Sequence, residues 1–150
     1  MGITTASEMI VEAFETDDLY KTFFHGHSYT GNPIACAAAN ASFELTRRLE
    51  FFANIERIAK NHLEYMAKIT DHQMVKNIRS LGTILAIELN LGNTSYMNKS
   101  RNALYKFFQD RGILMRPLGN VIYILPPFIM TDEQLGQVYD AIDELLETGI

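Results

Sequence analysis

The chain has a single cysteine, no long hydrophobic run and no cluster of basic residues. One cysteine, Cys36, excludes an intrachain disulfide and fits a reducing cytoplasm. No apolar run approaches the length of a membrane span, and no basic stretch leads into an apolar core near Met1. We therefore expect neither a membrane segment nor a signal peptide. The net charge of -5, with Arg47-Arg48 as the only adjacent basic pair, argues against a nucleic-acid-binding surface.

The composition is that of an ordinary globular domain. The 150 residues are 47% hydrophobic and 21% charged, which is enough for one compact domain with a sizeable core. Apolar periodicity and turn residues predict helices and short strands in a definite order. The predicted helices are 7–15, one from Pro33 with an apolar stripe as far as Leu49, 51–69, 99–110, and one capped by Thr131. The predicted strands are 74–79, 81–89, 113–116 and 121–125, with a polar turn at 90–95 and a hairpin turn at 117–120. This order predicts an α+β fold in which helices pack on a small, mainly antiparallel sheet.

Two residues within predicted helices carry expectations of their own. His62 lies on the apolar stripe of helix 51–69, and no second metal ligand stands three or four residues away. We therefore expect a buried, hydrogen-bonded structural histidine rather than a metal ligand. Cys36 lies in an alanine-rich helix, where we expect a small core residue rather than a nucleophile.

The most informative stretch is the polar loop 24–32, which leads directly into the helix that begins at Pro33. Asn32 is a good N-cap, and proline fits the first helical position because no amide hydrogen is needed there. A loop that carries Ser28, Thr30 and two glycines before a helix N-terminus suits an anion such as phosphate. The alternative is an ordinary loop before a capped helix.

Two blocks of sequence resemble a known family. His25–Pro33, followed by an alanine-rich helix, is similar to a motif of the class III, pyridoxal-phosphate-dependent aminotransferases. The second block is Gly112–Phe128, and the intervening Ser80–Glu88 also fits in order and spacing. The resemblance extends from about Ile3 to Leu146. Within the family it is strongest to the members that make 7,8-diaminononanoate for biotin.

The resemblance implies a fold, a division of the chain and a cofactor. Residues 32–150 would form the small C-terminal domain of a fold-type I aminotransferase, and residues 1–31 the trailing end of the large cofactor domain. Gly26, His27 and Ser28 would contact the phosphate of pyridoxal 5'-phosphate in the neighbouring subunit of a homodimer. Some relatives carry Pro-Thr in place of His27-Ser28, which leaves the role of the His27 side chain open.

The resemblance also assigns substrate contacts. Arg116 would bind the substrate carboxylate, because a guanidinium can hold a carboxylate with two parallel hydrogen bonds. Tyr123 would reach the substrate or S-adenosylmethionine side of the pocket. The alternatives are a solvated arginine at a strand end and an aromatic residue of the core or sheet edge.

No lysine in the chain matches the family's aldimine-forming lysine, which we expect upstream of Met1 together with the aspartate that pairs with the cofactor ring. No catalytic residue is therefore assigned, and we expect the chain alone to be inactive and to hold no cofactor. The expected full-length activity is cytoplasmic transfer of an amino group from S-adenosylmethionine to 8-amino-7-oxononanoate. Two alternatives stay open: another class III aminotransferase acting on ω-amino acids or diamines, and a non-catalytic interaction domain of the same fold. No metal, nucleic-acid partner or membrane partner is expected.

Overall fold

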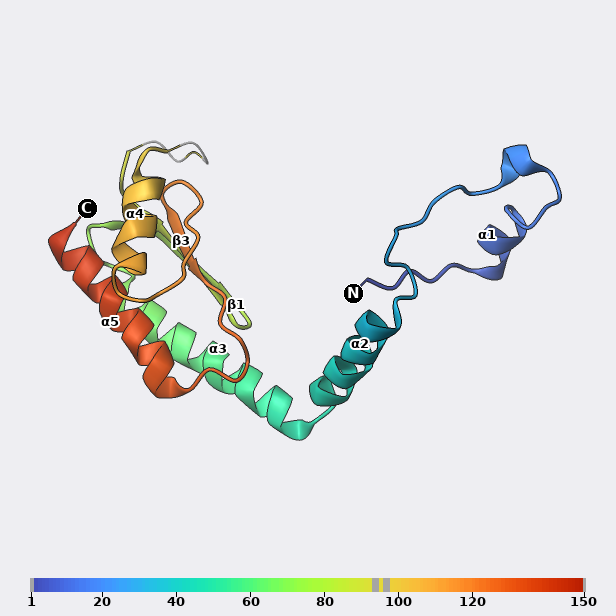
Figure 1. The fold of residues 1–150 in the computed structure, drawn as a ribbon. Coiled ribbons are helices and arrows are strands. Elements are labelled where there is room, and N and C mark those ends of the chain that lie inside the picture. Colours follow the sequence, from blue (N-terminus) through green and yellow to red (C-terminus); the bar gives the residue numbers. More distant parts are fainter. Residues whose placement is uncertain (1, 93–94, 96–97, 150) are drawn as a thin grey trace. The chain divides into compact units, whose positions relative to one another are not determined.

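The computed structural model describes residues 2–92, 95 and 98–149. Asn93 and Thr94 of the expected polar turn lie outside the described residues. The chain divides into two compact units, Met1–Arg48 and Leu49–Ile150 (Figure 1). No helix in the described ranges is long and apolar enough to cross a membrane.

The first unit contains three short or exposed helical elements. These are α1 (Glu8–Glu12), the 3-10 helix η1 (Leu19–Lys21) and α2 (Pro33–Thr46), and none of them contains a buried residue. Helix α1 is shorter than the predicted 7–15, and the Ser7 side chain makes no capping hydrogen bond. A five-residue helix without a capping hydrogen bond or a buried face lacks the interactions that would stabilise a longer helix.

Helix α2 begins where the sequence predicts. The Asn32 side chain accepts a hydrogen bond from the Ala35 amide at 3.0 Å, and Pro33 occupies the first turn. The expected apolar stripe is not buried, since Ile34 is 80% exposed. Cys36 is only half-buried. The expectation that Cys36 is a core residue is wrong because no residue of this helix reaches a core.

The second unit contains the sheet and the hydrophobic core. Its order is α3 (Leu49–Ile69), β1 (Val75–Leu81), β2 (Ile84–Leu89), α4 (Ser100–Gln109), β3 (Val121–Ile124) and α5 (Asp132–Thr148). The three strands are antiparallel in the order β1-β2-β3. This arrangement confirms the predicted α+β class. The Thr131 cap is also confirmed, because Thr131 and Gln134 form a reciprocal capping box at the start of α5.

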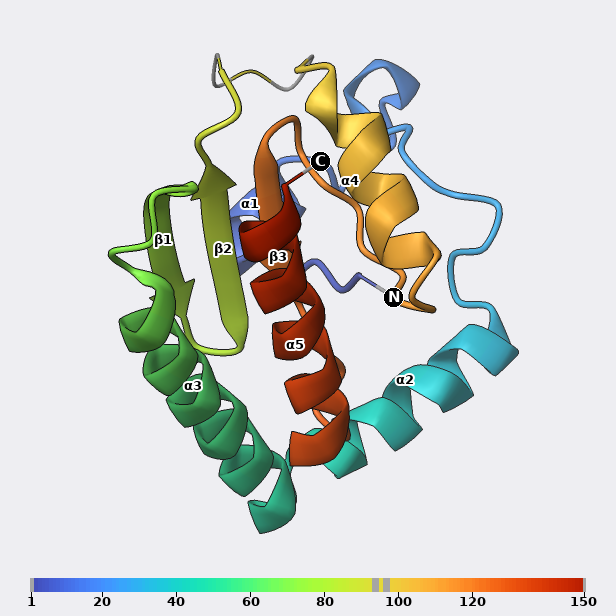
Figure 2. The same ribbon diagram turned by 90° about the vertical axis from the view of Figure 1, so that its left-hand side faces the viewer.

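One face of the sheet is covered by helices. Helices α3 and α5 lie side by side and run in the same direction across it (Figure 2). Alternate strand residues turn inward and pack with Leu104 and Phe108 of α4; the buried strand residues are Leu85, Ile87, Leu89, Ile122 and Ile124. The residues between them, such as Tyr123, point to the opposite face, because successive strand side chains alternate. No helix of the described part of this unit covers that face.

The expected strand 113–116 is absent. The Ile113 amide donates to the Phe108 carbonyl, which closes the end of α4, and the Met115 amide donates to Ile113. Pro117 has no amide hydrogen to offer a neighbouring strand. Of the predicted hairpin only the tight turn forms. In it the Leu118 amide donates to the Val121 carbonyl and the Val121 amide donates to the Leu118 carbonyl.

That turn is fastened to β2 by Asn120, which is fully buried. The Leu89 amide donates to the Asn120 carbonyl at 2.9 Å, and the Asn120 side-chain amide donates to the Leu89 carbonyl at 2.7 Å. Two hydrogen bonds of opposite direction therefore fix the turn on the end of the neighbouring strand.

His62 is the buried structural histidine that the sequence predicts, with no exposed surface. Its Nε2 lies 3.1 Å from the carbonyl oxygen of Thr83, and its Nδ1 lies 2.7 Å from the hydroxyl of Tyr139. A carbonyl can only accept, so Nε2 carries the proton and the tyrosine donates to Nδ1. Burial lowers the pKa of His62, which outweighs the opposite effect of the Thr83 carbonyl. The neutral ring thus joins α3, α5 and the β1–β2 turn.

We expect the free energy of unfolding to fall as the pH drops below the ordinary histidine pKa of 6.5. Because the folded-state pKa is lowered, the unfolded chain binds the proton first, and stability is lost from 6.5 down to the folded value. His62→Leu should remove that part of the pH dependence. It should also cost about 2–4 kcal/mol, since a buried carbonyl and hydroxyl lose their partner.

Urea unfolding between pH 5 and 8 measures both effects. His25→Gln alters an exposed imidazole in the other unit and is the control that should keep the acid slope. A His62→Leu chain with the same acid slope as the parent would refute the role assigned to His62.

A substitution at Gly119 tests how closely the 118–121 turn approaches the preceding loop. A Cβ atom at this position would lie 1.8 Å from the Ser95 carbonyl oxygen, and the backbone has a φ of +64°. Gly119→Ala should therefore lower the free energy of unfolding by on the order of 3 kcal/mol. Gly112 has a similar φ of +72° but open space around it, so Gly112→Ala should cost only about 1 kcal/mol. Equal losses in urea unfolding would contradict the steric explanation.

Candidate functional site

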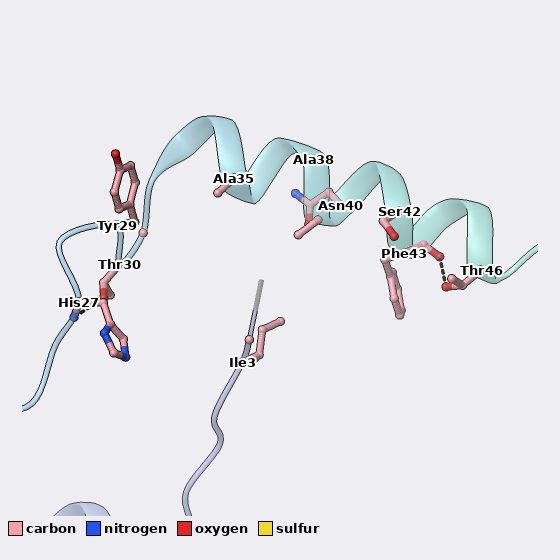
Figure 3. A pocket seen from close by; sticks show the side chains of 13 residues that line it. Ile3, His27, Tyr29, Thr30, Ala35, Ala38, Asn40, Ser42, Phe43 and Thr46 are labelled. Atoms are coloured by element: carbon pink, nitrogen blue, oxygen red, sulfur yellow. Dashed lines mark hydrogen bonds between the residues drawn. The ribbon is translucent and has the colours of Figure 1, made fainter. Parts of the chain in front are cut away.

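The loop before α2 is held by short-range hydrogen bonds. The His27 amide donates to the Thr30 hydroxyl oxygen at 3.1 Å, and the Thr30 amide donates to the His27 carbonyl at 2.9 Å. The Asn32 amide donates to the Tyr29 carbonyl at 3.1 Å. Figure 3 shows the labelled His27 and Thr30 side chains at the start of this turn. The loop is therefore a defined turn that ends at the capped helix.

The predicted phosphate-contacting residues lie together on this loop and are exposed. A Cβ atom built on Gly26 would meet nothing within 4 Å, so a ligand can approach the backbone there. The Ser28 hydroxyl makes no hydrogen bond to another described residue. An open glycine and an available hydroxyl fit a phosphate group.

The loop borders an open groove beneath α2 with a volume of about 1130 Å³. His27 and Tyr29 lie at one end, and Ala38 and Phe43 of α2 line it further along (Figure 3). The lining is mostly apolar, with polar side chains both on the loop and along α2, where Asn40, Ser42 and Thr46 lie. Mixed lining of this kind is common in sites for small molecules.

The two predicted substrate contacts lie in the second unit, one on each side of the 118–121 turn. Arg116 is exposed and makes no ion pair or hydrogen bond to another described residue. Tyr123 is half-buried on β3, opposite Ala86 of β2. It lines a groove of about 570 Å³ together with Leu114, Leu125 and Gln134, a groove that Arg116 does not line. The fixed turn thus sets the spacing between an available guanidinium and a phenol.

Sequence reasoning missed how two residues contribute. The sequence identifies Thr30 only as a polar loop residue, although its hydroxyl oxygen accepts the hydrogen bond from the His27 amide. The local signal is the spacing of three, because the second bond of a capping box also joins a side chain to the amide three residues before it. The sequence places Asn120 only in a turn, and its hydrogen bond to the Leu89 carbonyl cannot be predicted locally because Leu89 is distant in sequence. No group of three or more potential metal ligands occurs among the residues whose placement is described.

A loop before a capped helix, followed by a small α+β unit, matches part of the fold-type I aminotransferases. The chain belongs to the aminotransferase class-III family, whose sequence model matches residues 1–146.

Named relatives agree with this membership. The chain is 38% identical over 147 residues to the adenosylmethionine-8-amino-7-oxononanoate aminotransferase of Synechococcus elongatus, covering 98% of this chain and 34% of the relative. The crystal structure of the Methanocaldococcus jannaschii enzyme of the same name matches with a TM-score of 0.73 at 30% identity. That match covers 85% of this chain and 30% of the other. A Bacillus anthracis aminotransferase shares the fold, with a TM-score of 0.76 at 22% identity, over 93% of this chain and 34% of its own. The chain thus spans about a third of the relatives it matches.

The cap on α2 should control the shape of the loop. Asn32→Ala should weaken the helix by about 1 kcal/mol, because one amide of the first turn loses its acceptor. Since α2 has no buried residue to compensate, we expect a loss of helical circular dichroism and faster amide exchange at Ala35. Asn40→Ala, at an exposed position inside the same helix, is the matched control and should preserve or raise helicity. An unchanged spectrum in Asn32→Ala would contradict the role of the cap.

Proposed function

We propose that this chain provides the C-terminal part of an aminotransferase that moves an amino group from S-adenosylmethionine to 8-amino-7-oxononanoate. The product would be 7,8-diaminononanoate, in biotin biosynthesis. The observation that carries the proposal is the match over 98% of the chain to a relative with that name. The chain spans 34% of that relative, so the activity belongs to a longer protein.

The proposed cofactor is pyridoxal 5'-phosphate, with its phosphate held by Gly26, His27 and Ser28. The space around Gly26 and the available Ser28 hydroxyl support this assignment. The cofactor, when bound, supplies the electron sink for amino transfer. The loop would serve the site of the other subunit in a cytoplasmic homodimer. Its own task is to hold the phosphate without covalent chemistry.

Arg116 and Tyr123 are the proposed substrate contacts. Arg116 has no partner among the described residues, so its guanidinium can take the carboxylate of 8-amino-7-oxononanoate with two parallel hydrogen bonds. Tyr123 presents its ring to the groove beside β3 and would border the substrate or S-adenosylmethionine. These residues bind and orient the substrate.

The proposed cofactor-bonding lysine and the carboxylate for the ring nitrogen belong to the part of the relatives that this chain does not match. Four lysines of the chain are paired with acidic residues: Lys60, Lys68, Lys76 and Lys106. Lys21 lies in η1, in a context unlike the family motif. We accordingly assign residues 1–31 to the end of the large domain and 32–150 to the small domain.

A chimaera tests the proposal directly. The matching C-terminal third of the Synechococcus elongatus relative is replaced by this chain, and transamination of 8-amino-7-oxononanoate is assayed with different amino donors. Activity with S-adenosylmethionine is the expected result. A folded, cofactor-loaded chimaera that uses only ω-amino acids or diamines would favour another class III aminotransferase. A folded chimaera without any transaminase activity would favour a non-catalytic domain.

Within this chimaera, Arg116→Lys should raise the KM for 8-amino-7-oxononanoate about tenfold or more. Lysine keeps the charge but cannot make two parallel hydrogen bonds to a carboxylate. Steady-state kinetics in which only that substrate is varied measure the effect. Arg48→Lys, at an exposed position in the first unit, is the matched control. Equal KM values for the two variants would remove Arg116 from the substrate site.

A further inference from the structure

Strand β3 is paired with β2 along one edge, and its other edge is open. The backbone groups of successive residues in an antiparallel strand point alternately to the two edges. The Leu89 amide donates to the Asn120 carbonyl, and the register then makes Ile122 the next residue whose backbone groups face β2. The N–H and C=O groups of Val121 and Tyr123 therefore point to the open edge.

The hydrogen bonds along this open edge stop after one residue. Val121 exchanges two hydrogen bonds with Leu118, at 2.8 and 3.1 Å, which closes the 118–121 turn. The next residue on the same edge is Tyr123, and within the described part of the chain its N–H and C=O have no backbone partner. Continued by one step, the hairpin register of Leu118 and Val121 would place Arg116 opposite Tyr123. The amide and carbonyl of Arg116 have no backbone partner among the described residues either.

The side chains that precede the turn have the alternation that this register requires. Met115 is 5% exposed and would lie opposite Ile124, which is also 5% exposed and belongs to the core. Leu114 is 82% exposed and would lie opposite Leu125, which is 61% exposed. Inward and outward positions therefore agree in both pairs, as a correct register demands.

The backbone of the segment is also compatible with pairing. Pro117 would lie opposite Ile122, at a position whose amide points away from β3, so a residue without an amide hydrogen fits this outer edge. Ile113 is at an equivalent position, and its amide can keep its hydrogen bond to the Phe108 carbonyl. The Met115 amide would lose its hydrogen bond to the Ile113 carbonyl. Closure of the hairpin therefore breaks one short-range hydrogen bond.

An apolar groove separates the two arms of this open hairpin. It is the groove of about 570 Å³ that Leu114 and Met115 line together with Tyr123 and Leu125. An unpaired strand edge is a template for another strand, and burial of the apolar side chains of both arms favours pairing. The net gain from each hydrogen bond is small and comparable with the entropic cost of fixing a residue, so a bound ligand can shift the balance. We propose that residues 113–117 close onto β3 as a fourth strand when 8-amino-7-oxononanoate binds.

Closure would bring the two proposed substrate contacts together. In the open hairpin Arg116 does not line the groove that Tyr123 lines. Residues directly opposite each other in an antiparallel pair have their side chains on one face, with Cβ atoms about 4.5–5.5 Å apart. A substrate that contacts both the guanidinium and the phenol therefore binds the closed hairpin better and increases its population. This coupling rests on the proposed function, whereas the register of the closed hairpin does not.

The register is tested in the 150-residue chain alone, with Cys36→Ser as the background. Under oxidised glutathione, Leu114→Cys/Leu125→Cys should form its disulfide at least about tenfold faster than Leu114→Cys/Ile129→Cys, because closure places only the first pair directly opposite. Ile129 is a suitable control position, since it is 83% exposed and lines the same groove. Equal rates of disulfide formation would overturn closure in this register.

The coupling is tested by hydrogen exchange in the chimaera with the Synechococcus elongatus relative. Addition of 8-amino-7-oxononanoate should slow exchange at least about tenfold at the amides that gain an acceptor on closure. These are the amides of Leu114, Arg116, Tyr123 and Leu125. An active chimaera without this substrate-dependent protection would overturn the coupling alone. A folded chimaera without activity would overturn the proposed function and the coupling with it, and the disulfide rates would still decide the register.

A pair of substitutions at Leu114 separates closure from side-chain contact. Leu114→Pro removes an amide that the closed hairpin uses, at a position that is exposed in the open one. Leu114→Ala removes the side chain and keeps the amide, so it should keep the protection that Leu114→Pro loses. The KM for 8-amino-7-oxononanoate should be about threefold or more higher in Leu114→Pro than in Leu114→Ala. Equal protection and equal KM values in the two variants would contradict closure on substrate binding.

Discussion

The alternation of side chains along β2 and β3 is the constraint on which the second unit depends. Ile122 and Ile124 point into the core beneath α3, α4 and α5, and Tyr123 between them must point away. A shift in register by one residue would bury the tyrosine and expose both isoleucines. The burial of apolar side chains therefore determines which face carries the proposed substrate contact. The neutral His62 holds the same arrangement from the helix side through Thr83 and Tyr139.

The 118–121 turn positions the two proposed substrate contacts relative to the sheet. Asn120 binds both backbone groups of Leu89, and Gly119 permits an approach to Ser95 that no side chain would allow. Arg116 precedes the turn and Tyr123 follows it, so the end of β2 positions both. A sheet with one face that no described helix of this unit covers, and an exposed arginine beside it, are well suited to forming one wall of a larger site. The match to about a third of longer aminotransferases agrees with that view.

The sequence predicts the starts of the helices from their capping residues. The predictions that are wrong depend on packing between residues distant in sequence. Asn32 and Thr131 cap their helices as expected because capping involves only the next three residues. The strand expected at 113–116 does not form because apolar residues alone do not supply a partner strand. The Ile113 amide instead donates to the Phe108 carbonyl at the end of α4. The stripe on α2 is apolar, as the periodicity indicates, but periodicity does not say what covers it. The proposed roles of Ser28 and Arg116 rest on the resemblance to the family alone, since both side chains lack partners among the described residues.

The central proposal is that the loop that carries Ser28 and the Arg116 side chain of one chain would serve different sites of the proposed homodimer. Two chimaeras with the Synechococcus elongatus relative test it, one carrying Ser28→Asp and the other Arg116→Ala. Each should be nearly inactive alone. After unfolding and refolding together, half of the dimers are mixed and have one intact site, so about a quarter of the parental activity should return. No recovery, despite mixed dimers detected by mass spectrometry, would mean that both residues act in the same site and would contradict the account.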